Sequence, residues 1–479
     1  MNTKRRAQIW LSLVLVSLMM LASTLQAQHA PTRNLYIEEP IIQPLHSSGA
    51  GYRFTTAAAD TCTVDPAKEL FITDVSVVDD CYRTTYGKGA CPGTIAPATR
   101  GAWTFGRLME GIFATKDEKK LSHGVRQWLK LWTEDRIVNG ELVKARPAMR
   151  DLVLKPWEKA SKGGHLDMSK APFRLLAIVF RMDAPVQVST FPDLKSAGQF
   201  RMVYGLLDKD GNSTPFTIIF EYLLKADDEC QDVLDWAHSI HALSSYEFGP
   251  AYNAALQNIT DKIITPGAEP EFLLNGSALL AIRTNEAFLD TPWEMRSFAL
   301  ALPEDDDDEE EEDANGNGGG NQKPKARLDH IFNPITPAAH YQGSQRLGEF
   351  LVEFGPQILQ GFLRYPITYK GEPFLAGVAQ NSLDLGWHGP EPVCTATSPV
   401  VQRLLSVFTC QGCHGKDTQT NFLHVLPREA GQPAQLSRFM TGPVYRVTDS
   451  CNVVLQVNGD LGGRRNFVCN LLNTVCPQP

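Results

Sequence analysis

The signatures of several large enzyme classes are missing from this chain of 479 residues. It contains no Gly-x-Ser-x-Gly stretch, which excludes the sharp strand-to-helix turn that carries the serine nucleophile of α/β-hydrolases. The phosphate-binding loop and the His-Glu-x-x-His pattern are also missing, which excludes P-loop nucleotide chemistry and zincin-type proteolysis. No segment repeats along the chain, so repeat architectures are excluded as well.

Long hydrophobic runs are absent beyond the first residues. The apolar run 9–21 is interrupted only by serines, and it is too short and too close to the N-terminus for a stable membrane span. A basic stretch at residues 4–6 precedes it and the small residue Ala27 follows, as in a secretory signal peptide. We therefore expect residues 1–27 to be a signal peptide. The mature protein would be periplasmic or secreted in a bacterium, with no stable membrane insertion after cleavage.

An excess of basic residues is absent too. The formal net charge is −9, but ten consecutive acids at residues 304–313 contribute −10 and the basic stretch at residues 4–6 contributes +3. The rest of the chain therefore carries −2 and is close to neutral. This balance provides no basic surface for nucleic acid, so we expect no nucleic-acid partner.

Cysteine is present in a number that suits an exported protein. Two of the ten cysteines belong to a Cys-x-x-Cys-His motif. The other eight are Cys62, Cys81, Cys91, Cys230, Cys394, Cys451, Cys469 and Cys476. An even number in an oxidising compartment predicts up to four disulfides. Because three of these cysteines cluster near each end of the chain, at least one bridge must leave its cluster.

Composition divides the chain into segments. Residues 28–60 are polar and irregular and predict an extended lead-in. Residues 61–303 mix strand-like and helical patterns without a repeating βαβ period, which predicts an α+β domain of unknown role. The acidic and Gly/Asn-rich residues 304–326 cannot bury enough apolar surface to fold and predict a disordered linker. Residues 327–479 form a C-terminal region with many turns, for which we expect a mostly helical or irregular module.

Hydrophobic periodicity predicts the main elements. Strands are expected over residues 71–78, 173–180, 200–207, 216–224 and 278–282. Helices are expected over residues 123–137, 230–243, 252–264 and 400–408. The dipeptide Asp210-Gly211 lies between two of the strands and predicts that they form a hairpin.

One pentapeptide indicates a specific chemistry. Residues 410–414 read Cys-Gln-Gly-Cys-His, the pattern through which a c-type haem is attached. Each thiol adds to one vinyl group of the haem, and the adjacent imidazole can then reach the iron. A protein with this group handles electrons or a small molecule bound to the iron.

The residues around the pentapeptide strengthen this interpretation. Residues 404–415, Leu-Leu-Ser-Val-Phe-Thr-Cys-Gln-Gly-Cys-His-Gly, resemble the beginning of a c-type cytochrome domain, in which a helix delivers the thiols and a glycine follows the histidine. The resemblance implies a covalent haem c, with Cys410 and Cys413 as the thioether cysteines and His414 as the proximal iron ligand. It also implies electron transfer with a redox partner protein. We recognise no characterised family in residues 60–300.

A second, looser resemblance covers three stretches: Thr409 to His424, Pro427-Arg428 and Leu436-Ser437-Arg438-Phe439. These residues are similar to the ends of uncharacterised secreted bacterial proteins, and this similarity implies no activity.

The sixth iron ligand is not determined by the motif. We expect His424, ten residues downstream, more than Met440, which is the only methionine after the motif; His388 is a third candidate. A thioether raises the reduction potential and a second imidazole lowers it, whereas an open position permits peroxide or gas chemistry. The protein would be an enzyme only if this position is open or the domain at 61–303 holds a substrate.

Other interpretations of the motif stay open. A disulfide between Cys410 and Cys413 would suit a cofactor-free periplasmic or cell-surface binding protein. A redox-active Cys-x-x-Cys would need to begin a helix after a strand, whereas here a helix precedes the motif. A zinc site would need two more ligands, and no second motif nearby provides them.

Two further groups of polar residues are more typical of packing than of chemistry. His238 and His241 lie three residues apart on a predicted helix, and their apolar neighbours favour a structural role over metal binding. Four charged residues flank Trp293: Arg283, Glu286, Glu294 and Arg296. They could form a charged pocket, but we expect from them a partly buried ion-pair network that supports the fold.

Overall fold

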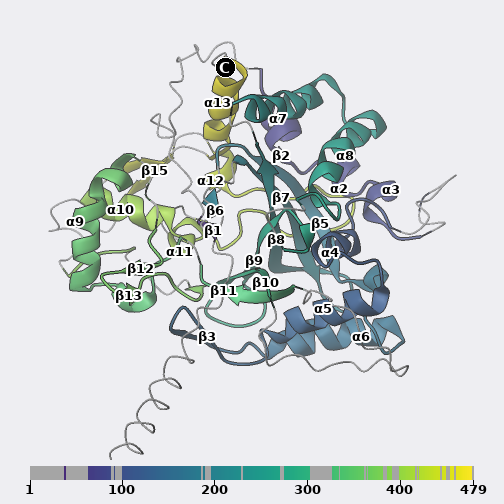
Figure 1. The fold of residues 1–479 in the computed structure, drawn as a ribbon, viewed down its shortest axis with the longest axis horizontal. Helices are drawn as coiled ribbons and strands as arrows, with labels where there is room; N and C mark the ends of the chain where they lie inside the picture. The colour runs from purple at the N-terminus through teal and green to yellow at the C-terminus, as the bar shows by residue number, and fades with distance from the viewer. Residues whose placement is uncertain are drawn as a thin grey trace, which may run out of the picture.

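The computed structural model describes only part of the chain: residues 37–38, 63–87, 91, 100–184, 187–188, 196–227, 230–269, 274–302, 326–333, 335–360, 363, 365–380, 386–390, 399–415, 418, 420–442, 445–448, 454–457 and 460–476. The expected signal peptide at 1–27, most of the lead-in and nearly all of the acidic segment lie outside these residues. Helices and an antiparallel sheet intermix in the rest (Figure 1), which agrees with the predicted α+β class.

An antiparallel sheet of eight strands forms the centre (Figure 1). Seven strands follow the order β11-β10-β9-β8-β7-β5-β2, and β14 pairs with β10 as well. The strands are β2 (Phe71–Ile72), β5 (Phe173–Arg181), β7 (Ser196–Leu207), β8 (Ser213–Lys225), β9 (Leu279–Glu286), β10 (Glu294–Ala301), β11 (Arg327–Ile331) and β14 (Ala379–Gln380). Every residue of β9 and β10 is buried, so both faces of the sheet must be covered by other elements.

The longest hairpin, β7–β8, forms as the sequence predicts. Tyr204 pairs with Ile218 across the two strands. In the connecting loop, Asp208 accepts hydrogen bonds from the backbone N–H groups of Asp210 and Asn212, both at 2.9 Å. Gly211 adopts a φ of +87°, a conformation that favours glycine. The Asp-Gly signal therefore identified both the turn and the pairing.

Helices cover one face of the sheet (Figure 1). They are α4 (Phe105–Ile112), α5 (Glu118–Lys130), α6 (Lys155–Ser161), α7 (Gln231–His241) and α8 (Pro250–Ile264). The main core lies between this layer and the sheet, where the rings of Trp128 and Trp132 from the α5 region pack on Phe298 of β10. Burial of these large aromatic side chains is a major part of the stability of this layer.

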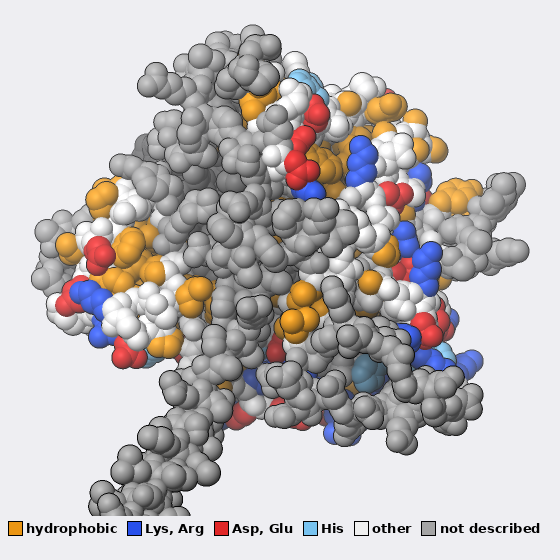
Figure 2. Space-filling model, viewed as in Figure 1, with side chains coloured by type: hydrophobic (Ala, Val, Ile, Leu, Met, Phe, Trp, Pro, Cys, Tyr) orange, Lys and Arg blue, Asp and Glu red, His pale blue; other side chains and the backbone are white. Residues whose placement is uncertain are grey.

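Elements from the C-terminal half cover the opposite face of the sheet and extend beyond its edge (Figure 1). The helices are α9 (Gln345–Gln360), α10 (Pro399–Phe408), α11 (Cys410–Cys413) and α12 (Arg438–Thr441). A further helix, α13 (Asp460–Leu472), begins at this face and packs its later residues, Val468, Cys469 and Leu471, into the main core. A small core joins Val179 and Val203 of the sheet to Cys413 and Met440. Figure 2 shows that hydrophobic side chains also reach the solvent over α9 and α10; Val352 of α9 is 80% exposed.

Short elements complete the structure. The remaining helices are α2 (Val75–Val78) and α3 (Cys81–Thr84). The remaining strands form four separate pairs: β1 (Ile37–Glu38) with β6 (Gln187–Val188), β3 (Arg136–Val138) with β4 (Glu141–Val143), β12 (Thr368–Tyr369) with β13 (Glu372–Pro373), and β15 (Tyr445–Thr448) with β16 (Val454–Val457).

Most predicted elements are confirmed, and two are wrong in part. The strand expected over 71–78 ends at Ile72, because the Asp74 carboxylate accepts a hydrogen bond from the Ser76 N–H at 2.9 Å and caps the helix α2. The helix expected over 123–137 ends at Lys130, and its last expected residues belong to β3. In both cases a local turn interrupts an apolar pattern that continues along the sequence.

The sheet continues across the acidic segment. β10 ends just before that segment, β11 begins just after it, and the two strands are antiparallel neighbours, with Ser297 opposite Ile331. Residues from both predicted regions of the chain therefore belong to one sheet.

Two disulfides connect described residues. Cys81–Cys91 closes a short loop within the N-terminal cluster, as expected, and Cys230–Cys476 is a bridge that leaves its cluster, joining the start of α7 to the end of the chain. Cys469 is disulfide-bonded as well. These bonds are compatible with an extracellular protein. None of the described helices is long and apolar enough to cross a membrane.

A buried arginine fastens the C-terminal segment to the sheet. Arg428, 3% exposed, donates to both carboxylate oxygens of Asp79, at 2.6 and 2.8 Å, and to the backbone carbonyls of Val78 and Leu175. Burial alone would raise the pKa of the Asp79 carboxyl, but the hydrogen bonds from Arg428 and Gly431 outweigh it and lower the pKa. The charges are therefore paired at the point where the two halves of the chain meet.

We expect the substitution Arg428→Met to destabilise the protein by about 3 kcal/mol, because it removes the donor to the partly buried Asp79 carboxylate and to the carbonyls of Val78 and Leu175. Urea unfolding measures the change. Arg438→Met, an exposed residue on the same segment, is the matched control and should cost less than about 1 kcal/mol. Equal losses for the two variants would contradict the role of Arg428.

Candidate functional site

The pentapeptide opens a helical turn of its own. α10 ends at Phe408, and the Thr409 hydroxyl then accepts a hydrogen bond from the Gly412 N–H at 3.1 Å, which caps α11. One helical turn separates Cys410 from Cys413, so their side chains lie on the same side of α11. The expectation that a helix, not a strand, precedes the motif is confirmed.

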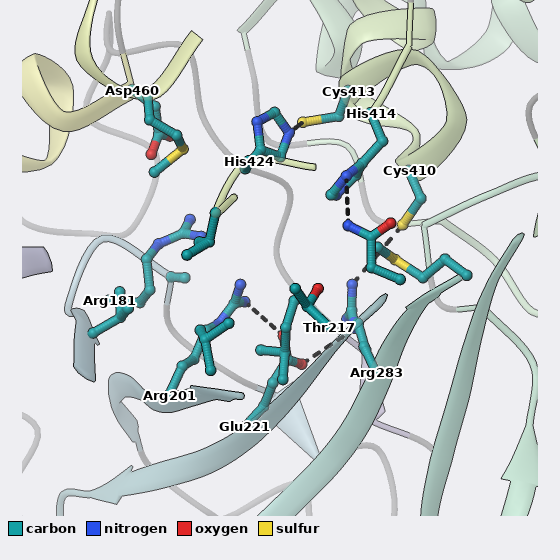
Figure 3. Close-up of a pocket in the computed structure, with 18 of the residues that line it drawn as sticks. Arg181, Arg201, Thr217, Glu221, Arg283, Cys410, Cys413, His414, His424 and Asp460 are labelled. Carbon is teal, nitrogen blue, oxygen red and sulfur yellow. Dashed lines mark hydrogen bonds and ion pairs between the residues drawn. The ribbon is translucent and has the colours of Figure 1, made fainter. Parts of the chain in front are cut away.

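A cavity lies between the motif and the sheet (Figure 3). The empty space around its walls, with the open solvent in front of it included, is about 980 Å³. Every candidate ligand from the sequence lines it except His388: Cys410, Cys413, His414, His424 and Met440. Apolar side chains form much of the remaining wall, including Phe71, Val179, Val203, Ile219, Phe408 and Phe439. The fold thus brings together residues whose proximity in space could not be read from the sequence.

His414 is held with one defined nitrogen available for a ligand. Its Nδ1 lies 2.7 Å from the backbone carbonyl of Phe422; since a carbonyl only accepts, Nδ1 carries the proton and Nε2 has the lone pair. Asn285 of β9 donates to the same carbonyl at 2.9 Å. The Trp293 ring stacks on the imidazole, with centroids 5.5 Å apart and planes 22° apart, and its indole N–H donates to Asn285.

The imidazole of His414 is also in the protonation state that metal binding requires. Burial lowers the pKa of His414 to about 4, with a further lowering by the Arg283 guanidinium; the hydrogen bond to Phe422 opposes both. The ring is therefore neutral at physiological pH. A neutral imidazole whose second nitrogen donates to a carbonyl is the usual arrangement of a histidine metal ligand.

Both cysteines of the motif are buried and present thiols to the cavity. Cys413 is not in a disulfide, so the Cys410–Cys413 bond of the binding-protein interpretation is not formed in this structure. Burial raises the pKa of the Cys413 thiol well above its ordinary value, with a smaller contribution from the Asp460 carboxylate. A thiol in this environment is protonated at neutral pH, unlike the low-pKa thiolate of a redox-active Cys-x-x-Cys.

The two candidates for the sixth ligand differ in position. His424 lies beside His414, with ring centroids 4.3 Å apart, and its Nε2 is 3.3 Å from the Cys413 sulfur. Two imidazoles that bind one metal ion from opposite sides, each at about 2 Å, have ring centres about 6 Å apart. His424 would thus have to move in order to face His414 across an iron. Met440, buried on α12, lines the cavity and supplies a thioether.

The other predicted residues lie elsewhere. His238 is exposed, and His241 pairs with Glu69 at 2.8 Å, so the two histidines do not converge. Within the described ranges, no three His, Cys, Asp or Glu side chains come together as metal ligands. A haem does not require such a set, because the porphyrin itself provides four of the iron ligands and the protein adds only the axial ones.

The charged residues around Trp293 divide between the two faces of the sheet. Glu286, Glu294 and Arg296 form the expected buried network on the helical face, where Arg146 joins them at 2.8 Å from Glu294. Arg283 faces the cavity and pairs with Glu221 at 3.3 Å. The alternation of side chains along a strand explains this division, because odd and even residues point to opposite faces.

Sequence reasoning missed several residues of the site. Asn285 and Trp293, which orient His414, had no motif to identify them, and the cavity arginines Arg181, Arg201 and Arg464 had none either. The arginines that interrupt the apolar runs of β5 and β7 were the one signal available. Charged residues on a strand that is buried on both faces indicate a polar site.

Comparison with known proteins gives no relative: no family model, no curated protein and no solved structure matches the chain.

We expect Cys413 in the haem-free protein to resist alkylation at neutral pH, because its thiol is buried and protonated. Labelling with iodoacetamide followed by peptide mass mapping measures the rate, which should be at least roughly a hundredfold slower than for an exposed cysteine. Ser239→Cys, on the exposed side of α7, provides that reference. Rapid labelling of native Cys413 would contradict the burial and favour a reactive thiol; full labelling is expected after denaturation.

Proposed function

We propose that this protein is a c-type haem protein that transfers electrons through one covalently attached haem. Cys410 and Cys413 would form the two thioether bonds, and His414 would bind the iron through Nε2. The observation that carries the proposal is the state of His414: a neutral imidazole whose Nδ1 is engaged by the Phe422 carbonyl, in a cavity that it shares with two buried thiols.

The chain's own residues suit this group in three ways. One turn of α11 places both thiols on one side, adjacent to the ligand histidine. Trp293 and Asn285 hold the imidazole plane and the Phe422 carbonyl in place. Apolar side chains form much of the wall, and the polarity around a haem affects its reduction potential.

When bound, the haem would supply reversible one-electron chemistry at its iron. The sixth position determines whether that chemistry stops at electron transfer. We propose Met440 or His424 for this position. Both line the cavity, but His424 contacts Cys413 and Ser437 and would have to leave both. An open sixth position would instead admit a small molecule, and the protein would then be a candidate enzyme.

The compartment supports the same proposal. We infer that the protein is periplasmic or secreted, because the N-terminal pattern is that of a signal peptide and the disulfides need an oxidising environment. An electron-transfer role there requires a redox partner protein.

The proposal predicts a haem that survives denaturation. The protein is expressed in the bacterial periplasm together with c-haem maturation machinery, and the reduced-minus-oxidised spectrum is recorded in denaturant after extraction with acidic acetone. A sharp α-band and an intact mass increased by one haem are expected. Replacement of both thiols, Cys410→Ala/Cys413→Ala, should abolish the retained haem.

The matched control removes a different pair of cysteines. Cys81→Ala/Cys91→Ala deletes a disulfide outside the cavity and should cost stability, by about 2–4 kcal/mol, while the haem stays attached. A colourless wild-type protein would refute the haem proposal and favour the cofactor-free binding protein. Single replacements Met440→Ala and His424→Ala, read by the low-spin spectrum with and without carbon monoxide, identify the sixth ligand.

A further inference from the structure

A group of arginines lines one part of the same cavity. Arg181 comes from β5, Arg201 from β7 and Arg464 from α13. Figure 3 shows Arg181 and Arg201 pointing from the strands into the cavity, on the side of Asp460 and opposite Cys410. Their presence in an otherwise apolar cavity is costly, because each guanidinium must be taken out of water.

Carboxylates pair with these arginines. Asp183 pairs with Arg181 at 2.9 Å, and Glu221 pairs with Arg201 at 3.1 Å. Glu221 also pairs with a fourth guanidinium, that of Arg283. Asp460 pairs with Arg464.

Arg464 is the member with unused donors. It is 5% exposed, and its Nη2 forms an ion pair with Asp460. Its Nε and Nη1 have no hydrogen-bond partner among the residues that the structure describes. Burial, together with the Arg181 charge and against the opposing carboxylates of Asp460 and Asp183, lowers the pKa of Arg464 to about 10. A buried guanidinium with two unsatisfied N–H groups is destabilising unless an acceptor enters the cavity.

We propose that Arg464, with Arg181 and Arg201, binds a carboxylate inside the cavity. A guanidinium presents two parallel N–H groups that match the two oxygens of a carboxylate. The carboxylate has two possible sources, a propionate of the haem or a free small carboxylic acid. The first source rests on the proposed function and the second does not.

The test removes the unused donors without leaving a buried charge. The double variant Asp460→Asn/Arg464→Gln deletes both members of one ion pair, so no carboxylate remains uncompensated. The matched control is Asp151→Asn/Lys155→Gln, an exposed pair of the same net charge at 2.7 Å on the helical side of the molecule. Arg464→Lys retains the charge but lacks the two-pronged geometry, and it replaces the double variant if that variant does not fold.

One arm uses protein without haem. In the Cys410→Ala/Cys413→Ala protein, succinate at constant ionic strength should raise the melting temperature in a saturable way. The additional change Asp460→Asn/Arg464→Gln should weaken succinate binding at least tenfold, Arg464→Lys should weaken it less, and the control pair should leave it unchanged.

The other arm uses the haem-bearing protein and measures its midpoint reduction potential. A cation near the haem favours the reduced state, so removal of the Arg464 charge should lower the potential if a propionate occupies the site. Covalent attachment itself should be unaffected, since Arg464 does not contact the thiols.

The outcomes separate the sources. Succinate binding that depends on Arg464 assigns the site to a free carboxylate, and a lower potential without succinate binding assigns it to a propionate. The absence of both effects overturns the carboxylate site even if the haem is attached. If no haem is attached, the proposed function fails, and the succinate arm alone decides the carboxylate site.

Discussion

The rest of the structure depends on the burial of both faces of one antiparallel sheet. β9 and β10 contain no exposed residue, so the sheet is stable only when a layer covers each face. Helices cover the first face with a large aromatic core. The second face is covered by segments that come after β11 in the chain, and this cover leaves the cavity that contains the motif. The site is therefore formed at the contact between the cover and the sheet.

This arrangement explains why the polar groups of the site lie where they do. The Arg428–Asp79 pair holds the segments that follow β11 against the sheet side of the molecule through charge-assisted hydrogen bonds. Elsewhere the same face carries the arginines Arg181 and Arg201 where an apolar side chain would pack better. A charged residue in the apolar pattern of a buried strand lowers the stability of the protein, and such residues are expected at functional sites. On the helical face, by contrast, the four charges of the Arg146 network are balanced and hydrogen-bonded.

Local signals predicted the elements but not their assembly. The hairpin at Asp210-Gly211 and the continuous apolar run of β5 were readable because turn chemistry and periodicity act over a few residues. The motif was readable for the same reason. The partners of His414 were not: Asn285 bonds the Phe422 carbonyl across 137 residues of sequence. Such contacts follow from strand order and register, and a single sequence does not encode these in any short pattern.

If the proposed haem is attached, the burial of the two thiols constrains the order in which the protein matures. Cys410 and Cys413 are 3% and 6% exposed; Cys413 packs against Phe439 and Met440 of α12, and Cys410 belongs to the core that contains α10. Cofactor attachment would then have to precede closure of the C-terminal helices over the sheet. The bridge from Cys230 to Cys476 ties the start of α7 to the segment after α13, so it holds these two elements together once they have docked. In that order of events, α13 would dock only after the proposed haem is attached, and attachment would take place on a chain that is not yet fully folded.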